Sequence, residues 1–552
     1  MSAFIIENMA PIMFVSLVVF LLAGYPAAFS LGAVGLLFAF IGIELGQFRP
    51  DFLQALPERV YGVMSNDTLL AIPFFTFMGL ILERSGMAED LLDTIGQLFG
   101  TIRGGLAYAV IFVGALLAAT TGVVAASVIS MGLISLPIML RYGYDRRMAS
   151  GVIAASGTLA QIIPPSLVLI VMADQLGKSV GDMYEGAFIP GLVLAALYAS
   201  YAFLVSMIFP KAAPGLPPEA IGFREKDGSR GLVSLGVLTI ASVAFAWLAM
   251  RGSTTRGADF VVLSMFFGIV FAFFVAVLNW VLDKFTGKRF LSAMAQQTTF
   301  VMVPPLFLIF LVLGTIFIGI ATPTEGGAMG ATGALLLGAA KRRLSWDLIR
   351  QATESTAKLS AFVIFILIGA RVFSLTFYGV SGHVWVEHLL TSLPGGQVGF
   401  LIFVNAMVFI LAFFLDFFEL AFIIIPLLGP AAEKLGIDLI WFGVILAVNM
   451  QTSFMHPPFG FALFYLRSVA PKESYVDKVT GLRMEPVTTG QIYWGAVPFV
   501  VIQCIMVGLV IAFPQMVMHY KGVASTIDPN TIQIEVPLME LPPLDFGPPT
   551  KQ

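Results

Sequence analysis

Two short stretches place hydroxyl and amide side chains inside long apolar runs, each beside a pair of prolines. The first reads ASGTLAQIIPPS (155–166) and the second reads VNMQTSFMHPP (448–458). Proline removes a backbone donor and clashes with the preceding helical turn, so each pair predicts a broken helix with free carbonyl groups. Carbonyl, hydroxyl and amide oxygens are hard ligands of the kind that Na⁺ prefers. The candidate ligands here are Ser156, Thr158, Gln161, Ile163, Asn449, Gln451, Thr452 and Ser453.

Two more polar stretches interrupt the middle of long apolar runs. They read ATTGVVAAS, with Thr120, Thr121 and Gly122, and FLDFFEL, with Asp416. We predict that each run enters and leaves the membrane on the same side as a re-entrant hairpin, with its polar stretch at the tip. An acidic side chain at membrane depth is costly, which makes Asp416 a functional candidate. Each tip is expected to complete one sodium site with the broken helix of its own half, so that Thr120, Thr121 and Gly122 serve the first site and Asp416 the second.

The composition is that of a polytopic helical membrane protein. The chain has 552 residues, of which 58% are hydrophobic and 11% are charged, whereas soluble domains have roughly 45–50% apolar and about 25% charged residues. The net charge of −3 predicts no nucleic-acid partner. A single cysteine, Cys504, excludes an internal disulfide framework. The N-terminal stretch lacks the basic region and cleavage site of a signal peptide, so we interpret it as the first membrane segment.

The chain contains an internal repeat. At a constant offset of 293, Pro164-Pro165 aligns with Pro457-Pro458, Asp145 with Asp438, and Pro137 with Pro430. Charge then orients the copies, because the loop RYGYDRR is basic and its equivalent EKLGID is not, and basic loops stay in the cytoplasm. The copies are therefore predicted to be inverted, as in many secondary transporters. Arg251 and Arg256 are exceptions to this charge rule, since the threading places their loop outside.

These signals predict an all-α polytopic fold with about twelve transmembrane helices, two re-entrant hairpins and two broken helices. The first repeat is expected over 1–210, with its hairpin at about 104–141 and its broken helix at about 145–177. The second is expected over 300–515, with the hairpin at about 395–433 and the broken helix at about 438–468. Residues 211–299 add a cytoplasmic loop and two extra spans, and 516–552 form a Pro-rich tail. Both termini are expected in the periplasm.

Structural roles compete with these functional interpretations. Asp416-x-x-Glu419 and Thr322-x-x-Glu325 both match the capping-box pattern of a helix start. For Thr322 and Glu325 we favour capping over a direct role, and for Asp416 we favour the direct role because it lies at a tip. Individual hydroxyls at the breaks could equally satisfy backbone groups. His456, which precedes the second proline pair, is interpreted as a packed, hydrogen-bonded histidine in preference to a proton relay. Arg371 is interpreted as an interface anchor or subunit contact, and Cys504 as a small apolar residue.

Three long motifs resemble the large membrane subunit of tripartite ATP-independent periplasmic (TRAP) transporters, the DctM-like permease. They read GYDRRMASGVIAASGTLAQIIPPS, GIATPTEGGAMGA and FLDFFELAFIIIPLLGPAAEKLGID. The resemblance implies a Na⁺-driven importer of organic acids in a bacterial inner membrane, with Na⁺ as coupling ion and no organic cofactor. It also implies an elevator-like mechanism of the ion-transporter superfamily. The implied partners are a small four-helix membrane subunit, a periplasmic substrate-binding protein and membrane lipid.

Within this resemblance, we expect the substrate carboxylate to lie between the two tips, near Thr121, Ser166 and Asp416, where helix N-termini provide positive dipole ends. The chain departs from the family at the first tip, where two serines of the family's usual pattern are Val123 and Val124. Either backbone carbonyls then supply the ligands there, or the substrate contacts are more apolar.

Other functional classes are less well supported. A stand-alone Na⁺/dicarboxylate transporter of the same superfamily is the alternative within transport. An intramembrane enzyme is disfavoured, since no His-Glu-x-x-His motif is present. A passive scaffold would not need two broken helices with polar tips. The identity of the acid is not encoded in this chain if a binding protein selects it.

Overall fold

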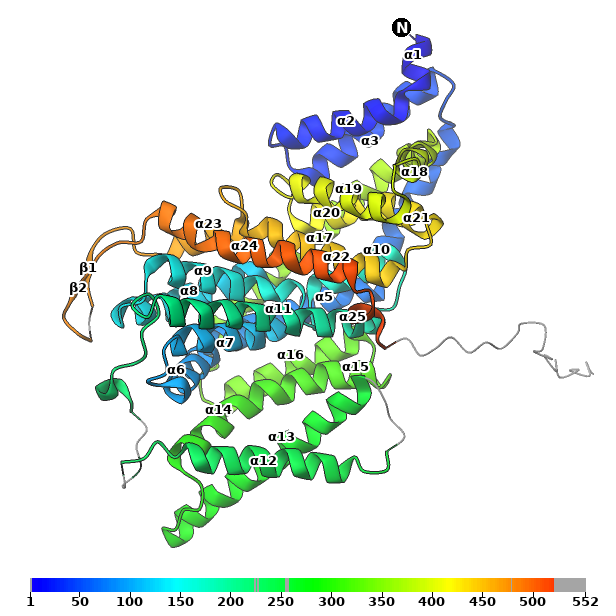
Figure 1. Ribbon diagram of the computed structural model, residues 1–552. Coiled ribbons are helices and arrows are strands. Elements are labelled where there is room, and N and C mark those ends of the chain that lie inside the picture. The colour runs from blue at the N-terminus through cyan, green and yellow to red at the C-terminus, as the bar shows by residue number, and fades with distance from the viewer. Residues whose placement is uncertain (1, 223–224, 226–227, 254–257, 478, 521–552) are drawn as a thin grey trace, which may run out of the picture.

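The computed structural model describes residues 2–222, 225, 228–253, 258–477 and 479–520 (Figure 1). The regular secondary structure of this part of the chain is helical except for two strands of two residues each, β1 (Tyr475–Val476) and β2 (Arg483–Met484), which pair antiparallel. The predicted all-α class is confirmed. The strands lie at one end of the long helices, and α25 (Gln515–Met518) lies at the other (Figure 1).

The first half of the chain forms a succession of helices up to residue 208. In chain order these are α1 (Ser2–Glu7), α2 (Met9–Leu22), α3 (Ala27–Glu44), η1 (Pro50–Ala55), α4 (Leu56–Met64), η2 (Asp67–Leu70), α5 (Ala71–Arg84), α6 (Met87–Phe99), α7 (Gly105–Thr121), α8 (Val124–Arg141), α9 (Arg146–Thr158), η3 (Leu159–Gln161), α10 (Leu167–Leu176) and α11 (Val180–Ile208). The pair α7 and α8 occupies the range expected for the first hairpin, and α9, η3 and α10 occupy that of the first broken helix.

A short helix and two long helices separate this half from the next: η4 (Pro218–Ala220), α12 (Leu232–Ala249) and α13 (Ala258–Thr286). The second half contains α14 (Ala293–Ile309), the π-helical turn η5 (Phe310–Gly314), α15 (Thr315–Phe317), α16 (Pro323–Ala340), α17 (Trp346–Gly379), α18 (Gly382–Thr391), α19 (Gly396–Leu411), α20 (Phe417–Ile423), α21 (Ile425–Lys434), α22 (Leu439–Met455), α23 (Phe461–Val469) and α24 (Thr489–Ala512). In Figure 1, α12 and α13 form one outer edge of the molecule and α2 and α3 the opposite edge.

Eight described helices are long and apolar enough to cross a membrane, or up to ten if each of two bent helix pairs counts as one span. This is fewer than the expected total of about twelve, which stays a prediction. Helices α2, α7, α10 and α22 are apolar but shorter. The predicted hairpins and broken helices account for three of these short helices. Helix α7 would be one arm of a hairpin, and α10 and α22 would each be one half of a broken helix.

Residues at the 293 offset have the same local structure in both halves. Asp145 caps the N-terminus of α9 by accepting from the N–H groups of Arg147 and Met148. Asp438 caps α22 in the same way, with Ile440 and Trp441 as donors. Pro137 and Pro430 both lie inside helices, and the Pro164–Pro165 and Pro457–Pro458 bonds are both cis. The inverted orientation of the two halves across a membrane stays a prediction.

The broken helices form the most deeply buried part of the fold. Every residue of α9 from Met148 onward is buried, and every residue of α22 is buried except Trp441. Helix α9 packs closely on α24, because a Cβ atom on Gly151 would lie 2.1 Å from the carbonyl oxygen of Gly495. Glycine at this crossing therefore allows two backbones to touch, as small residues do between membrane helices. Such packing fixes the polar side chains of the breaks in the interior.

Candidate functional site

A cavity of about 280 Å³ lies between the two hairpin tips. The first tip contributes Gly122–Ala125 and the second contributes Asp416–Phe418. The other lining residues come from the two broken helices and from α17: Gln161, Leu167, Val168, Leu359, Phe362, Phe454, Phe461 and Tyr465. Both hairpins and both broken helices thus meet at one cavity.

Four helices begin at the wall of this cavity. The first residues of α8, α10, α20 and α23, which are Val124, Leu167, Phe417 and Phe461, all line it. The backbone N–H groups of a helix's first turn lack partners within the helix and carry a partial positive charge. Side chains cap α10 and α20, but no side chain caps α8 or α23. The cavity therefore favours an anion, although no basic side chain is among the described residues that line it.

The first tip packs directly on the first break. Gly122 ends α7 with φ of +60°, a conformation that glycine adopts at little cost. A Cβ atom at this position would lie 3.2 Å from Leu167 Cγ and 3.8 Å from the carbonyl oxygen of Pro165. The tip and the start of α10 are thus in contact, and the position admits no larger side chain without movement.

The second tip packs on the second break through aromatic rings. The Phe413 ring stacks on the His456 ring, with centroids 4.5 Å apart, and it also stacks on Phe459 at 5.7 Å. Phe409 contacts the His456 ring edge-on at 5.2 Å. His456 is packed, as expected, but its Nδ1 atom has no hydrogen-bond partner among the described residues, which differs from the predicted hydrogen-bonded histidine.

Asp416 combines a structural role with a place at the cavity. Its Oδ1 atom accepts from the N–H of Glu419 at 2.9 Å, and Glu419 Oε2 accepts from the N–H of Asp416 at 2.9 Å, which completes a capping box. The Thr322–Glu325 box has the same geometry but is exposed and away from the cavity. Both pairs therefore cap a helix, and of the two capping residues only Asp416 also lines the cavity.

Several predicted ligands already hydrogen-bond to backbone groups through their polar side-chain atoms. The Ser166 hydroxyl donates to the carbonyl of Gln161 at 2.8 Å and accepts from the N–H of Val168 at 3.2 Å, and the residue does not line the cavity. The hydroxyls of Thr452 and Ser453 donate to carbonyls one turn earlier, at 3.3 and 3.4 Å. Asn449 donates to the carbonyl of Asn405 at 2.8 Å. Their roles as ligands of Na⁺ or substrate stay predictions.

Thr158 and Gln451 were expected in different sodium sites, but their side chains meet. Gln451 Nε2 donates to Thr158 Oγ1 at 3.2 Å, and Gln503 Nε2 donates to Tyr198 OH at 2.7 Å. Further contacts of 3.4 Å join Gln451 to Tyr198 and Gln503 to Thr158. All four residues are fully buried. They form one polar cluster between α9, α11, α22 and α24.

Some buried oxygen atoms remain without a partner in the described structure. Four of them belong to the first break and the polar cluster: Ser156 Oγ, Gln161 Oε1, Gln451 Oε1 and Gln503 Oε1. A buried polar atom without a hydrogen bond is costly, so such atoms mark places where a cation or water would be stabilising. Only Gln161 of these four also lines the cavity.

Ile163 lies in the non-helical break, and its N–H donates to the Leu159 carbonyl at 2.9 Å. Thr120 and Thr121 belong to α7, but their side chains lie outside the described residues.

Sequence reasoning missed the apolar walls and half of the polar cluster. Leu359 and Phe362 of α17 line the cavity, but nothing distinguishes them in sequence from other apolar residues of a membrane helix. Tyr198 and Gln503 lie in long apolar helices outside the repeat motifs. A buried glutamine in such a helix is a usable signal, because polar residues inside membrane spans are rare. Val123 and Val124, the departures from the family pattern, both line the cavity and make its first wall apolar.

Comparisons with known proteins agree on one family. Residues 14–516 match the family described as "Tripartite ATP-independent periplasmic transporter, DctM component". The C4-dicarboxylate TRAP transporter large permease protein DctM of Pseudomonas aeruginosa is 27% identical over 76% of this chain and 82% of that protein. The isethionate TRAP transporter permease protein DctMQ of Oleidesulfovibrio alaskensis is 25% identical over 83% of this chain, which spans only 60% of that longer protein.

The sialic acid TRAP transporter permease protein SiaT of Haemophilus influenzae is 21% identical over 88% of this chain and 66% of that protein. Among solved structures, the YdaH transporter of Alcanivorax borkumensis matches with a TM-score of 0.48 and 13% identity, over 85% of this chain and 90% of that chain. That structural likeness is too low to support a conclusion.

Proposed function

This chain belongs to the DctM family, the large permease component of TRAP transporters, and we propose that it imports an organic acid together with Na⁺ through the cavity between its hairpin tips. Membership implies a multi-pass protein of the inner membrane that works with a small membrane subunit and a periplasmic binding protein. The relatives named above carry names for C4-dicarboxylate, isethionate and sialic acid. An organic anion is the substrate class that these names share with the chemistry of the cavity.

The convergence of four helix N-termini on the cavity carries this proposal. The uncapped starts of α8 and α23 belong to the first hairpin and the second broken helix, and these two helices contact each other. A carboxylate between them would accept hydrogen bonds from backbone N–H groups and gain from both dipoles, as anions do at helix N-termini. The aromatic and aliphatic walls would meet the carbon skeleton of the substrate. The binding position predicted near Asp416 is retained, whereas Ser166 serves α10.

Sodium supports this site by balancing charge. An anionic substrate would enter a cavity that already contains the Asp416 carboxyl group, and like charges repel each other strongly in a site of low dielectric constant. Na⁺ bound beside Asp416 and Gln161 would offset this repulsion, so that substrate and cation bind best together. Gln161 Oε1 is a buried oxygen atom without a partner among the described residues, and the Asp416 carboxyl group lines the same cavity.

The position of the cavity also fits an elevator mechanism. Its walls are the two hairpins and the two broken helices, with one further wall from Leu359 and Phe362 of α17. Helix α17 packs against α3 so closely that a Cβ atom on Gly369 would lie 2.4 Å from the Ala28 carbonyl oxygen. We assign α3 and α17 to the fixed scaffold. The hairpins and broken helices would carry the cavity past α17 as one body.

Two measurements, made one after the other, test this function. First, thermal-shift screening of the partner binding protein against organic acids identifies the substrate. Second, uptake of that acid is measured in proteoliposomes that contain this chain and the small subunit, with the binding protein outside. We expect uptake with an inward Na⁺ gradient and none when K⁺ replaces Na⁺. Full uptake driven by protons alone would exclude Na⁺ coupling, and full uptake without the binding protein would favour the stand-alone alternative.

A further inference from the structure

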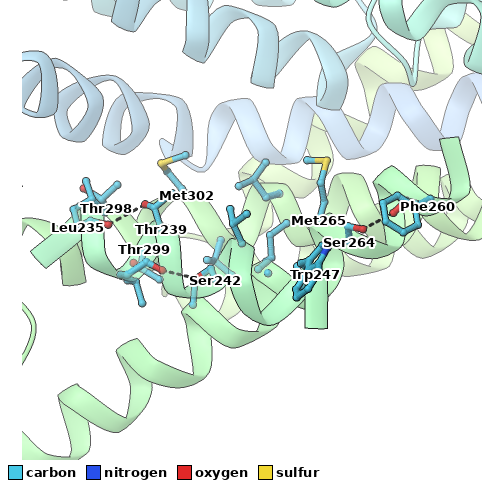
Figure 2. Close-up of a pocket in the computed structure, with 18 residues that line it drawn as sticks. Leu235, Thr239, Ser242, Trp247, Phe260, Ser264, Met265, Thr298, Thr299 and Met302 are labelled. Atoms are coloured by element: carbon cyan, nitrogen blue, oxygen red, sulfur yellow. Dashed lines mark hydrogen bonds between the residues drawn. The ribbon is translucent and has the colours of Figure 1, made fainter. Parts of the chain in front are cut away.

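The two inserted helices leave a groove against the second half of the chain. A cavity of about 510 Å³ lies between α12, α13 and α14, and its walls are almost entirely apolar (Figure 2). The inserted pair is anchored beside it by a small buried cluster of Leu238, Ala276, Leu291 and Ala295. The helices therefore touch only in part and leave a space between them.

The hydroxyl groups in this groove are already satisfied by their own helices. Thr239 donates to the Leu235 carbonyl, Ser242 to Leu238 and Thr299 to Ala295, at 2.8 to 2.9 Å. Ser264 donates to Phe260 at 2.6 Å. The groove thus offers no free hydroxyl donor from these residues to a polar ligand, and its surface favours hydrocarbon.

A positive charge lies at one end of the groove. Figure 2 shows Leu235 and Thr298 at one end, and Trp247 and Phe260 at the other. The Arg251 guanidinium lies 5.4 Å from the centroid of the Trp247 ring, an arrangement typical of a cation–π interaction. Arg251 forms no ion pair within the described residues, and it is one of the two basic residues that break the charge rule of the threading. An apolar groove that ends at an unpaired guanidinium matches the two parts of a phospholipid.

We propose that this groove binds one phospholipid, with an acyl chain between α12, α13 and α14 and the phosphate at Arg251. The lining residues of α12 extend from Leu235 to Trp247, which is about 18 Å at 1.5 Å per residue. One leaflet occupies about half of the ~30 Å hydrocarbon core, a similar length. The lipid fills the gap between the inserted pair and the second half of the chain.

The size of the groove favours a lipid chain over a protein helix. At the ~30 Å³ that a water molecule occupies, 510 Å³ holds roughly 17 groups of methylene size, or about one acyl chain. A transmembrane helix is about 10 Å across with its side chains and could only lie over the mouth of the groove. A helix of the small subunit is therefore the competing occupant that the experiment must distinguish.

The test uses the complex of this chain with its small subunit in vesicles that contain phosphatidylglycerol with a diazirine in one acyl chain. After illumination, peptide mapping is expected to find lipid adducts on groove residues such as Met265 and Met302. Gly268→Leu should reduce these adducts severalfold, because the new side chain occupies the groove, and its Cβ would meet Ser242 at an ordinary 3.5 Å. Gly236→Leu is the matched control on α12, since nothing lies within 4 Å of that position and it does not line the groove.

The headgroup is tested separately. Arg251→Gln should reduce adducts about fivefold, the factor that corresponds to ~1 kcal/mol for one basic residue at a lipid surface. Lys284→Gln is its matched control, because Lys284 lies 5.3 Å from the Trp280 ring, which does not line the groove. If Gly268→Leu does not fold, Val243→Trp blocks the exposed mouth of the groove instead. Unchanged adducts in the filled variant, or lipid adducts on the small subunit in place of the groove residues, would overturn the proposal.

Discussion

Gln451 of α22 donates a hydrogen bond to Thr158 of α9 at 3.2 Å, and the two residues are 293 positions apart, the same offset that aligns the two Pro-Pro pairs. Equivalent positions of the two halves are therefore bonded to each other in the interior. Tyr198 and Gln503 join the same cluster from α11 and α24. The two broken helices are held together at this point, so that a displacement of one is transmitted to the other.

Removal of both partners from this cluster should cost less stability than the two single removals added together. Gln451→Leu or Thr158→Val alone leaves buried polar groups unpaired, which costs about 1–3 kcal/mol. The double variant should destabilise by less than the sum of the single variants. Unfolding in a detergent titration measures this coupling, with Thr332→Val as control because Thr332 is exposed and donates to the Ala328 carbonyl of its own helix. Strict additivity, within about 0.3–0.5 kcal/mol, would show that the cluster does not act as a unit.

The contact between the first tip and the first break should matter for transport beyond stability. Gly122 and Gly177 both end helices, with φ of +60° and +62°, so alanine costs about 1–2 kcal/mol of backbone strain at either position. Only at Gly122 does the added Cβ press on Leu167. Gly122→Ala should therefore slow uptake about tenfold or more, as small displacements at a binding site do. Equal uptake by the two variants would show that the tip does not need this contact.

The sequence predicted which helices and breaks form the site better than it predicted which side-chain atoms face the cavity. Proline pairs, glycines and N-cap aspartates have local physical causes, so helices end and begin close to these residues. The re-entrant course of the two hairpins in a membrane stays a prediction. Side-chain direction is a tertiary property, and local sequence does not determine it. Ser166 and Thr452 were chosen for their hydroxyls, but these hydroxyls bond backbone carbonyls. Phe461 and Leu359 line the cavity without any sequence signal, because an apolar residue at a binding site resembles one that faces lipid.

The loop between α23 and α24 should be stabilised by the ion pair of Asp477 with Arg141, and this carboxylate should stay ionised at mildly acidic pH. Arg141 at the end of α8 forms a bidentate pair with Asp477, with N–O distances of 2.9 to 3.1 Å. This guanidinium holds the pKa of the Asp477 carboxyl well below its ordinary value. A carboxyl with a lowered pKa stabilises the fold fully above its unfolded pKa of about 3.9, and the contribution is lost as the pH falls through the folded pKa.

Arg141→Gln should therefore lower the melting temperature by the same amount between pH 7 and about pH 5, and by less as the pH falls below about 4. Arg146→Gln is the control, since Arg146 pairs at 3.3 Å with Glu485, which is 78% exposed, and such surface pairs contribute little. A difference that grows toward low pH would contradict the assignment of the stabilisation to this pair.

Transport should require the negative charge of Asp416, whereas the capping of α20 by this residue should not be limiting. Asparagine caps helices about as well as aspartate does, so Asp416→Asn should fold and assemble normally. Loss of a charged interaction worth ~1.5–3 kcal/mol predicts that uptake falls roughly ten- to a hundredfold. Asp145→Asn is the matched control, because Asp145 caps α9 away from the cavity. Near-normal uptake by Asp416→Asn would move the substrate and cation away from this tip.

The most direct test asks whether substrate occupies the cavity between the tips. Ala125 lines the cavity and its neighbour Ala126 does not, although both are half-buried. Each is replaced by cysteine in a Cys504→Ser background, which removes the single native thiol, and the rate of labelling by a small thiol reagent is measured. We predict that the transported acid together with Na⁺ slows labelling of Ala125→Cys severalfold, that K⁺ in place of Na⁺ abolishes this protection, and that Ala126→Cys is unaffected. Equal labelling of Ala125→Cys with and without the acid, in a variant that still transports, would show that the substrate binds elsewhere.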